Sequence, residues 1–180
     1  MISSKLKTNK IILLTILNLL FVVLITINFT SCCAYSFTGA SVPKHLKTVA
    51  IPIAEDRSGS GEPGLRETLT QDLITKFTED NTLQVAQRTE ANAILESTIT
   101  SLSDAPAIVS PGEQIKFRRI TISVKVLYRD LVERKTIFDK TFTEYSDYAS
   151  SEPVQGRNDA INLTLNKISE DILLDTISGW

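Results

Sequence analysis

The sequence predicts an α+β fold: a two-layer sandwich in which two amphipathic helices cover one face of a mostly antiparallel or mixed sheet of about four to five strands. Two stretches carry apolar residues at the spacing of an amphipathic helix, and several others show the alternation of a strand. Their order along the chain is strand, helix, several strands, helix. Two helices are therefore available to cover one sheet.

The first strand is expected over 48–53, TVAIPI, where Val49, Ile51 and Ile53 alternate onto one face. Pro52 cannot donate a hydrogen bond to a neighbouring strand, which predicts an edge strand or a bulge at this position. The next stretch, 55–64, contains two Ser-Gly pairs and a proline, so it is expected to be a loop.

Two later stretches have the period of a helix. The first begins near residue 65 and is expected to stop at Asp80-Asn81, and the second runs over about 156–177. Their apolar stripes consist of Leu65, Leu69, Leu73 and Phe77 in the first, and of Ile161, Leu165, Ile168 and Ile172 in the second. Each stripe predicts one buried helix face.

The remaining strands are predicted from alternation and β-branched residues. Strands are expected over 83–86, 93–102, 120–128 and 136–145, with loops over 103–112 and 146–156. The stretch 120–128 has the clearest pattern, because apolar side chains alternate with polar and charged ones throughout. A turn over 129–134 makes it one arm of a hairpin.

The N-terminus has the pattern of an export signal. Residues 1–10 contain three lysines and no acid, residues 11–29 contain no charge, and Cys32-Cys33 follows Thr30-Ser31. Small residues before a cysteine at this place predict a lipoprotein cleavage site, with lipid on Cys32. A retained transmembrane anchor is the alternative, and Cys33 is the alternative modified residue.

This interpretation divides the chain into three parts: a signal peptide over 1–31, a lipidated tether over 32–46 and one domain over 47–180. Removing 1–31 takes away three of the 19 basic residues and none of the 21 acidic ones. The rest has 16 basic and 21 acidic residues, a net charge near −5. Such a balance argues against nucleic acid as a partner.

Few residues suit catalysis or metal binding. The two cysteines are adjacent and belong to the predicted anchor, which excludes a cysteine-based zinc site in the domain. The single histidine, His45, lies in the predicted tether beside two lysines and is expected to be solvated. We expect no cofactor, no metal and no catalytic residue.

Basic residues gather in the predicted hairpin. Arg119, Lys125 and Arg129 share the polar side of one strand, where they could bind an anionic ligand such as a phosphorylated glycolipid. The alternative is an ordinary solvated face balanced by nearby acids.

Several segments resemble the LptE family of lipopolysaccharide-assembly lipoproteins, in its Bacteroidetes and Chlorobi form. They are YSFTGASVP at 35–43, KTVAIPIAEDRSG at 47–59, EPGLRETL at 62–69, NTLQV at 81–85, RRITISVKV at 118–126 and the terminal ISGW. The resemblance implies a sheet with two helices on one side. It also implies a non-catalytic outer-membrane lipoprotein that plugs the LptD β-barrel, faces the periplasm and barrel lumen, and assists delivery of lipopolysaccharide. Among the family's functional residues, only the lipidated cysteine can be matched to a position in this sequence, Cys32.

The same strand, loop and helix at 47–77 also resemble the opening of curli-secretion-type lipoproteins, which build an oligomeric pore. A periplasmic hydrolase is a third hypothesis, disfavoured by the lack of an evident nucleophile and base.

Overall fold

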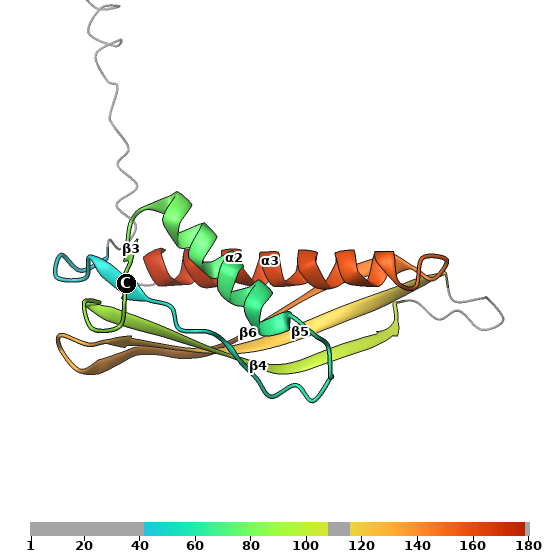
Figure 1. The fold of residues 1–180 in the computed structure, drawn as a ribbon, viewed down its shortest axis with the longest axis horizontal. Coiled ribbons are helices and arrows are strands. Elements are labelled where there is room, and N and C mark those ends of the chain that lie inside the picture. Colours follow the sequence, from blue (N-terminus) through green and yellow to red (C-terminus); the bar gives the residue numbers. More distant parts are fainter. Residues whose placement is uncertain (1–41, 108–115, 179–180) are drawn as a thin grey trace, which may run out of the picture. The chain divides into compact units, whose positions relative to one another are not determined.

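A computed structural model describes residues 42–107 and 116–178. Within these ranges the chain forms six strands and two helices, labelled as in Figure 1. The elements are β1 (Thr48–Ala50), β2 (Glu55–Asp56), α2 (Leu65–Asp80), β3 (Gln84–Val85), β4 (Ala93–Pro106), β5 (Phe117–Asp130), β6 (Lys135–Ala149) and α3 (Gln155–Ser178). The predicted leader and Cys32 lie outside these residues.

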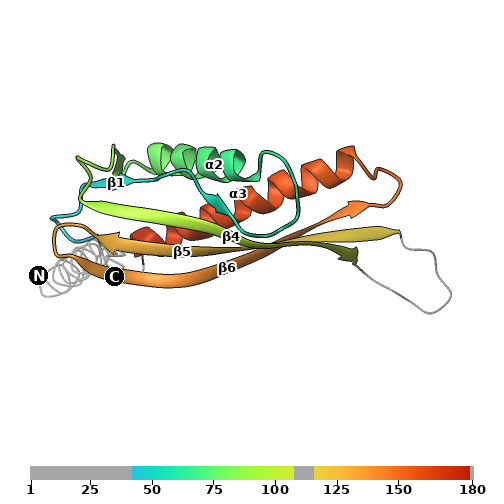
Figure 2. The same ribbon diagram turned by 60° about the horizontal axis from the view of Figure 1, so that its bottom comes forward.

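One mixed sheet contains all six strands. Its order is β3-β1-β4-β5-β6, and β2 pairs with β4 beside β1. The pairs that involve β1, β2 and β3 are parallel, and those between β4, β5 and β6 are antiparallel. Both helices lie on the same face of the sheet (Figures 1 and 2). The predicted two-layer α+β fold is confirmed, with a slightly larger sheet than expected.

The first predicted strand is interrupted at Pro52. Ala50 on β1 lies opposite Ile94 of β4, and Glu55 on β2 lies opposite Thr98. Five residue steps on one side therefore match four on the other, and the extra residue falls around the proline, which has no N–H to donate. Of the two predicted alternatives, an edge strand or a bulge, the extra residue around Pro52 fits the bulge, and the edge position is excluded because β1 lies between β3 and β4.

Ile53 is also misplaced by the simple alternation. Val49 and Ile51 are buried as expected, but Ile53 is 53% exposed. The extra residue around Pro52 breaks the two-residue period before Ile53, so its side chain no longer follows the other two.

Helix α2 begins and ends where the sequence predicts. Its four predicted apolar residues are all buried in the core. Gly64 precedes the helix with a φ of 80°. At the other end Asn81 adopts a φ of 57° and donates its backbone N–H to the carbonyl of Phe77 at 3.1 Å. Asparagine tolerates this left-handed conformation better than most residues, which ends the helix there.

Strand β5 confirms the clearest pattern in the sequence. Its residues from Ile120 to Tyr128 alternate between buried and more exposed. The flanking strands are longer than predicted, since β4 continues to Pro106 and β6 to Ala149. The expected loops at 103–106 and 146–149 are therefore wrong. Long pairing with β5 extends both strands beyond their apolar segments.

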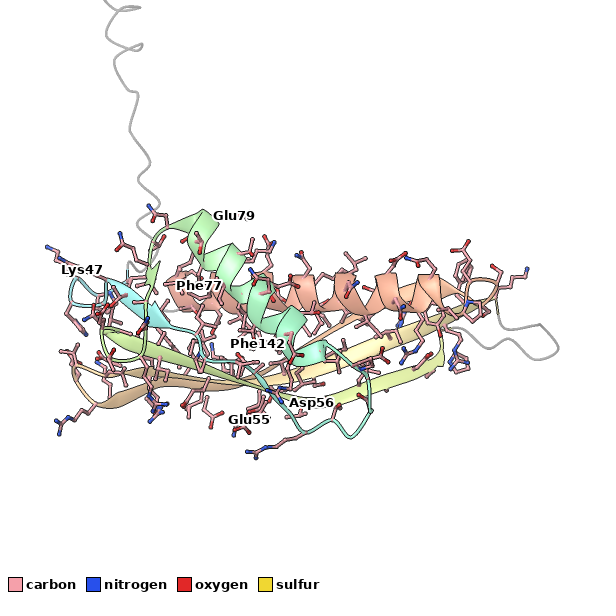
Figure 3. The ribbon with its side chains drawn as sticks, viewed as in Figure 1. Lys47, Glu55, Asp56, Phe77, Glu79 and Phe142 are labelled. Atoms are coloured by element: carbon pink, nitrogen blue, oxygen red, sulfur yellow. The ribbon has the colours of Figure 1, made fainter. Side chains whose placement is uncertain are left out.

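The core lies between the sheet and the two helices. All four predicted apolar residues of α3 are buried there, together with Thr164 and Thr176. Both threonine hydroxyls donate to the carbonyl four residues earlier, at 2.7 Å, which satisfies them inside the core. Figure 3 shows Phe142 on the helix side of the sheet and Glu55 on the opposite side.

The packed part of the chain includes the end of the predicted tether. Leu46 is buried in the core, and Val42 packs against it. Among the residues that the structure describes, no helix is both long enough and apolar enough to cross a membrane.

Candidate interaction face

The sheet face opposite the helices is polar. We call it the outer face and define it by the side chains of β4, β5 and β6 that point away from α2 and α3. On β5 these are the odd-numbered residues, because the even-numbered residues from Ile120 to Asp130 are buried. The register adds neighbours from β4 and β6, so that the face includes Glu96, Thr98, Phe117, Arg119, Thr121, Ser123, Lys125, Leu127, Arg129, Asp139, Thr141, Thr143, Tyr145 and Asp147.

The three cations predicted from the sequence share this face, and each lies beside a carboxylate from a neighbouring strand. Lys125 Nζ lies 3.1 Å from Asp139 on β6. Arg129 Nη2 donates to Glu96 Oε2 on β4 at 2.6 Å. The row of positive charge expected from the sequence is thus balanced by acids within ion-pair distance.

Arg119 forms the most complete of these pairs. It donates two hydrogen bonds to Asp147, at 2.7 and 2.9 Å, and its guanidinium carbon lies 3.9 Å from the centroid of the Tyr145 ring. The hydrogen bond from Arg119 holds the pKa of Asp147 below its ordinary value, although burial acts in the opposite direction. Both side chains remain more than one-third exposed, so solvent screens the pair.

Hydroxyl groups occupy the space between the charged pairs. Ser123 on β5 and Thr143 on β6 share a hydrogen bond at 2.9 Å between their side-chain oxygens. Thr121 and Thr141 lie on the same face. This middle region offers donors and acceptors without net charge.

A second polar cluster lies on the helix side of the sheet, and we call it the end cluster. Asp104 on β4 accepts hydrogen bonds from Arg118 at 2.8 Å, from the Tyr148 hydroxyl at 2.8 Å and from Arg157 of α3 at 3.2 Å. Arg157 also donates to Glu62, ahead of α2, at 2.6 Å. The cluster joins three strands, α3 and the segment before α2.

The end cluster cannot be predicted from local sequence patterns. Asp104 and Tyr148 both lie in stretches that the sequence predicts to be loops, whereas the structure places them in β4 and β6. The hydrogen bonds raise the pKa of the Arg118 guanidinium still further, so its charge is permanent. The arginine therefore serves to hold the strand ends together.

His45 is not simply solvated, contrary to the prediction. Its Nε2 lies 2.6 Å from Oδ2 of Asp130, at the end of β5. The Asp130 side chain is fully buried, whereas the histidine ring is 33% exposed. The contact joins the start of the domain to the β5–β6 turn, an association between distant segments that local sequence does not reveal.

Comparison with known protein families shows to which family the chain belongs. A family model described as "LptE: Lipopolysaccharide-assembly" matches residues 46–176. The chain belongs to the LptE family. The match reaches from Leu46, ahead of β1, into the last turn of α3, so it covers all six strands, α2 and nearly all of α3. This confirms the resemblance and makes the protein a lipopolysaccharide-assembly lipoprotein by family.

Solved structures share the LptE-type fold at low sequence identity. A protein of Xanthomonas campestris has a TM-score of 0.57 at 13% identity, over 77% of this chain and 91% of that one. A hypothetical protein of Chlamydia trachomatis has a TM-score of 0.54 at 10% identity, over 71% and 94%. The PelC dodecamer of Paraburkholderia phytofirmans has a TM-score of 0.52 at 10% identity, over 78% and 94%. These likenesses show the fold alone. No curated protein matches the chain.

In this LptE-family chain the structure brings Arg119, Lys125 and Arg129 onto one face, as the sequence predicts. Their contact with an anionic glycolipid stays a prediction. Sequence reasoning missed the acidic partners on β4 and β6. Counting outward from the turn at 131–134 does not predict the Arg119–Asp147 pair, because it places Ser146 opposite Arg119. The register shifts by one residue between Tyr128 and Arg129, and only this shift brings Asp147 opposite Arg119.

Proposed function

We propose that this LptE-family protein is a non-catalytic outer-membrane lipoprotein, anchored by lipid on Cys32. Its domain faces the periplasm and docks in the lumen of an LptD-type β-barrel. There it plugs and supports the barrel through which lipopolysaccharide reaches the outer leaflet. The family match supports the process, and the barrel partner is our inference.

The observation that carries the docking proposal is the chemistry of the outer face. The interior of an outer-membrane barrel is polar, so a domain inside it must present polar groups to the wall. The outer face supplies hydroxyls and balanced ion pairs over three long strands, and neither helix covers it (Figures 1 and 2). It is therefore the face that we assign to the barrel wall.

Lipopolysaccharide contact by Arg119, Lys125 and Arg129 is a second part of the proposal. Exposed ion pairs contribute little to stability, so their carboxylates can be exchanged for another anion at small cost. A phosphate group offers a guanidinium the same two-pronged geometry that Asp147 offers Arg119. The face could thus pass from internal pairing to ligand binding without refolding.

The test is to purify the tagged full chain from detergent-solubilised outer membrane and identify its partner by mass spectrometry. We expect a large β-barrel protein to co-purify. The double substitution Ser123→Arg and Thr143→Arg in the middle of the outer face should remove it. Asn166→Arg, at an exposed position of α3, is the matched control and should retain it.

Two outcomes contradict the proposal. A homo-oligomeric ring without a barrel favours the curli-secretion-type alternative. A barrel that is retained by the outer-face variant and lost by Asn166→Arg assigns docking to the helices instead.

A further inference from the structure

Three side chains with metal-binding atoms meet at one end of the domain. They are His45, which precedes β1, Asp130 at the end of β5, and Glu133 in the following turn. Their ligand atoms all lie within 4.8 Å of one another, and they form the one such group among residues 42–107 and 116–178. His45 is the single histidine of the chain.

Asp130 is held so that one oxygen points at the histidine. Its Oδ1 accepts the backbone N–H groups of Val132 and Glu133, each at 2.8 Å. Oδ2 is left facing His45 Nε2 at 2.6 Å. The same backbone turn that fixes the aspartate also sets the position of Glu133. The group therefore differs from a cluster of exposed acids, because the Asp130 carboxylate is buried and held in one orientation beside the His45 ring.

The distances fit a small ion with slight adjustment. Bonds of about 2.0–2.2 Å to nitrogen and oxygen ligands place neighbouring ligand atoms of a tetrahedral zinc site roughly 3.3–3.6 Å apart. His45 Nε2 lies 2.6 Å from Asp130 Oδ2 and 3.8 Å from Glu133 Oε1. The His45–Asp130 separation must therefore widen by about 0.7–1.0 Å, and the His45–Glu133 separation must narrow by about 0.2–0.5 Å. Glu133 is 48% exposed and can shorten its own distance, whereas the widening must come from the His45 ring, which is 33% exposed, because the Asp130 side chain is buried.

The remaining contacts leave the ligand atoms available. Lys135 Nζ pairs with the other oxygen of Glu133, Oε2, at 2.5 Å, so Oε1 remains directed toward the histidine. Two carboxylates and a neutral imidazole carry a charge that balances a divalent cation. The nitrogen ligand and the small number of oxygens favour zinc over calcium or magnesium, which prefer more oxygen ligands.

We propose that His45, Asp130 and Glu133 bind a zinc ion, with solvent at the fourth position. The ion joins the segment that enters the domain to the β5–β6 turn, and so fixes where the chain from the N-terminus meets the sheet. This inference is independent of the proposed barrel partner and of lipopolysaccharide contact.

The experiment uses the full chain in detergent with Cys32→Ser and Cys33→Ser, because free thiols also bind zinc. A streptavidin-binding tag replaces polyhistidine for the same reason. Zinc is titrated by calorimetry, and cobalt substitution reports tetrahedral coordination through its visible absorbance. We expect one equivalent of zinc per chain and a tetrahedral cobalt spectrum.

Variants then assign the ligands. His45→Gln should weaken zinc binding by more than about tenfold, and Glu133→Gln should weaken it by a smaller factor. Glu79→Gln, an exposed position on α2 labelled in Figure 3, is the matched control and should change nothing. Zinc binding that is absent, or that both ligand variants leave unchanged, overturns the proposal. Because Glu133 is exposed in a turn, its variant gives an answer even if His45→Gln fails to fold.

Discussion

Arg119 on β5 donates two hydrogen bonds to Asp147 on β6, and the same guanidinium lies over the ring of Tyr145. The pair is more than one-third exposed on a sheet face that neither helix covers. The pair has well-aligned hydrogen bonds, but solvent screens it, so another anion can replace the Asp147 carboxylate at small cost. That combination makes the outer face suited to recognition more than to stabilising the fold.

The first prediction concerns glycolipid binding. Replacing Arg119, Lys125 and Arg129 together by alanine should weaken binding of purified lipopolysaccharide by about tenfold, because the three cations that we propose bind its phosphates are lost. The matched control replaces Lys76, Lys140 and Lys167, three cations whose partners lie on or beside α3. Binding is measured by calorimetry with detergent-dispersed lipopolysaccharide. Equal loss in both triple variants would show a general charge effect and contradict a specific role of the outer face.

The end cluster should contribute to stability. Tyr148→Phe removes a hydroxyl that donates to Asp104 at 2.8 Å and accepts from Arg118 at 3.1 Å. We expect the free energy of unfolding to fall by about 1 kcal/mol, because the partly buried Asp104 carboxylate loses a hydrogen bond. Urea unfolding of the purified protein measures the change. Tyr145→Phe is the control, since Tyr145 is 49% exposed and should lose little. Similar losses in the two variants would argue against the cluster.

Asp171 on α3 should make stability depend on pH. Burial raises its pKa, and Glu144 and Glu170 raise it further. The folded-state pKa lies above the unfolded value of 3.8. The contribution of Asp171 to the free energy of unfolding is therefore fully present below pH 3.8, and it is lost as the pH rises through the raised pKa. Asp171→Asn should therefore raise the urea midpoint slightly at pH 7 and leave it unchanged near pH 3.5.

The control for this measurement is Asp159→Asn, at an exposed position of the same helix whose carboxylate accepts a hydrogen bond from Gln155. It should not show the same pH-dependent gain. A gain for Asp171→Asn that is larger in acid than at neutral pH would contradict the assigned direction.

The anchor is tested at Cys32. Cys32→Ser should abolish incorporation of a palmitate analogue and leave the predicted leader uncleaved, because it removes the thiol that we propose is acylated. Metabolic labelling and the mass of the purified chain report both effects. Cys33→Ser is the matched control and should still be labelled. Labelling that survives in Cys32→Ser and disappears in Cys33→Ser would move the modification by one residue.

Local sequence patterns predict the helices and strands in which buried residues recur at the regular spacing of a helix or of a strand. The apolar stripe of α2 and the alternation of β5 both depend on residues close in sequence, and both are confirmed. The place of β1 inside the sheet could not be predicted in this way. It depends on parallel pairing with β3 and β4, which lie more than thirty residues further along the chain.

The ends of β4 and β6 show why polar segments mislead. Asp104 and Tyr148 belong to stretches whose composition is typical of loops, yet both lie in strands. Each is satisfied by a partner from another element, so the strand continues without an apolar pattern. The outer face likewise has one part that the sequence predicts and one part that it does not. Its cations follow from alternation on one strand, whereas their acidic partners depend on register.

The most direct test of barrel docking is site-specific photo-crosslinking in native outer membranes. A crosslinking amino acid is placed at Thr121 on the outer face, at Asn166 on α3 as the control, and the products are identified by mass spectrometry. We predict that Thr121 captures a large β-barrel protein through the wall of its lumen and that Asn166 captures it much less. Capture of another copy of this chain at Thr121, with no barrel product at either position, would contradict the account.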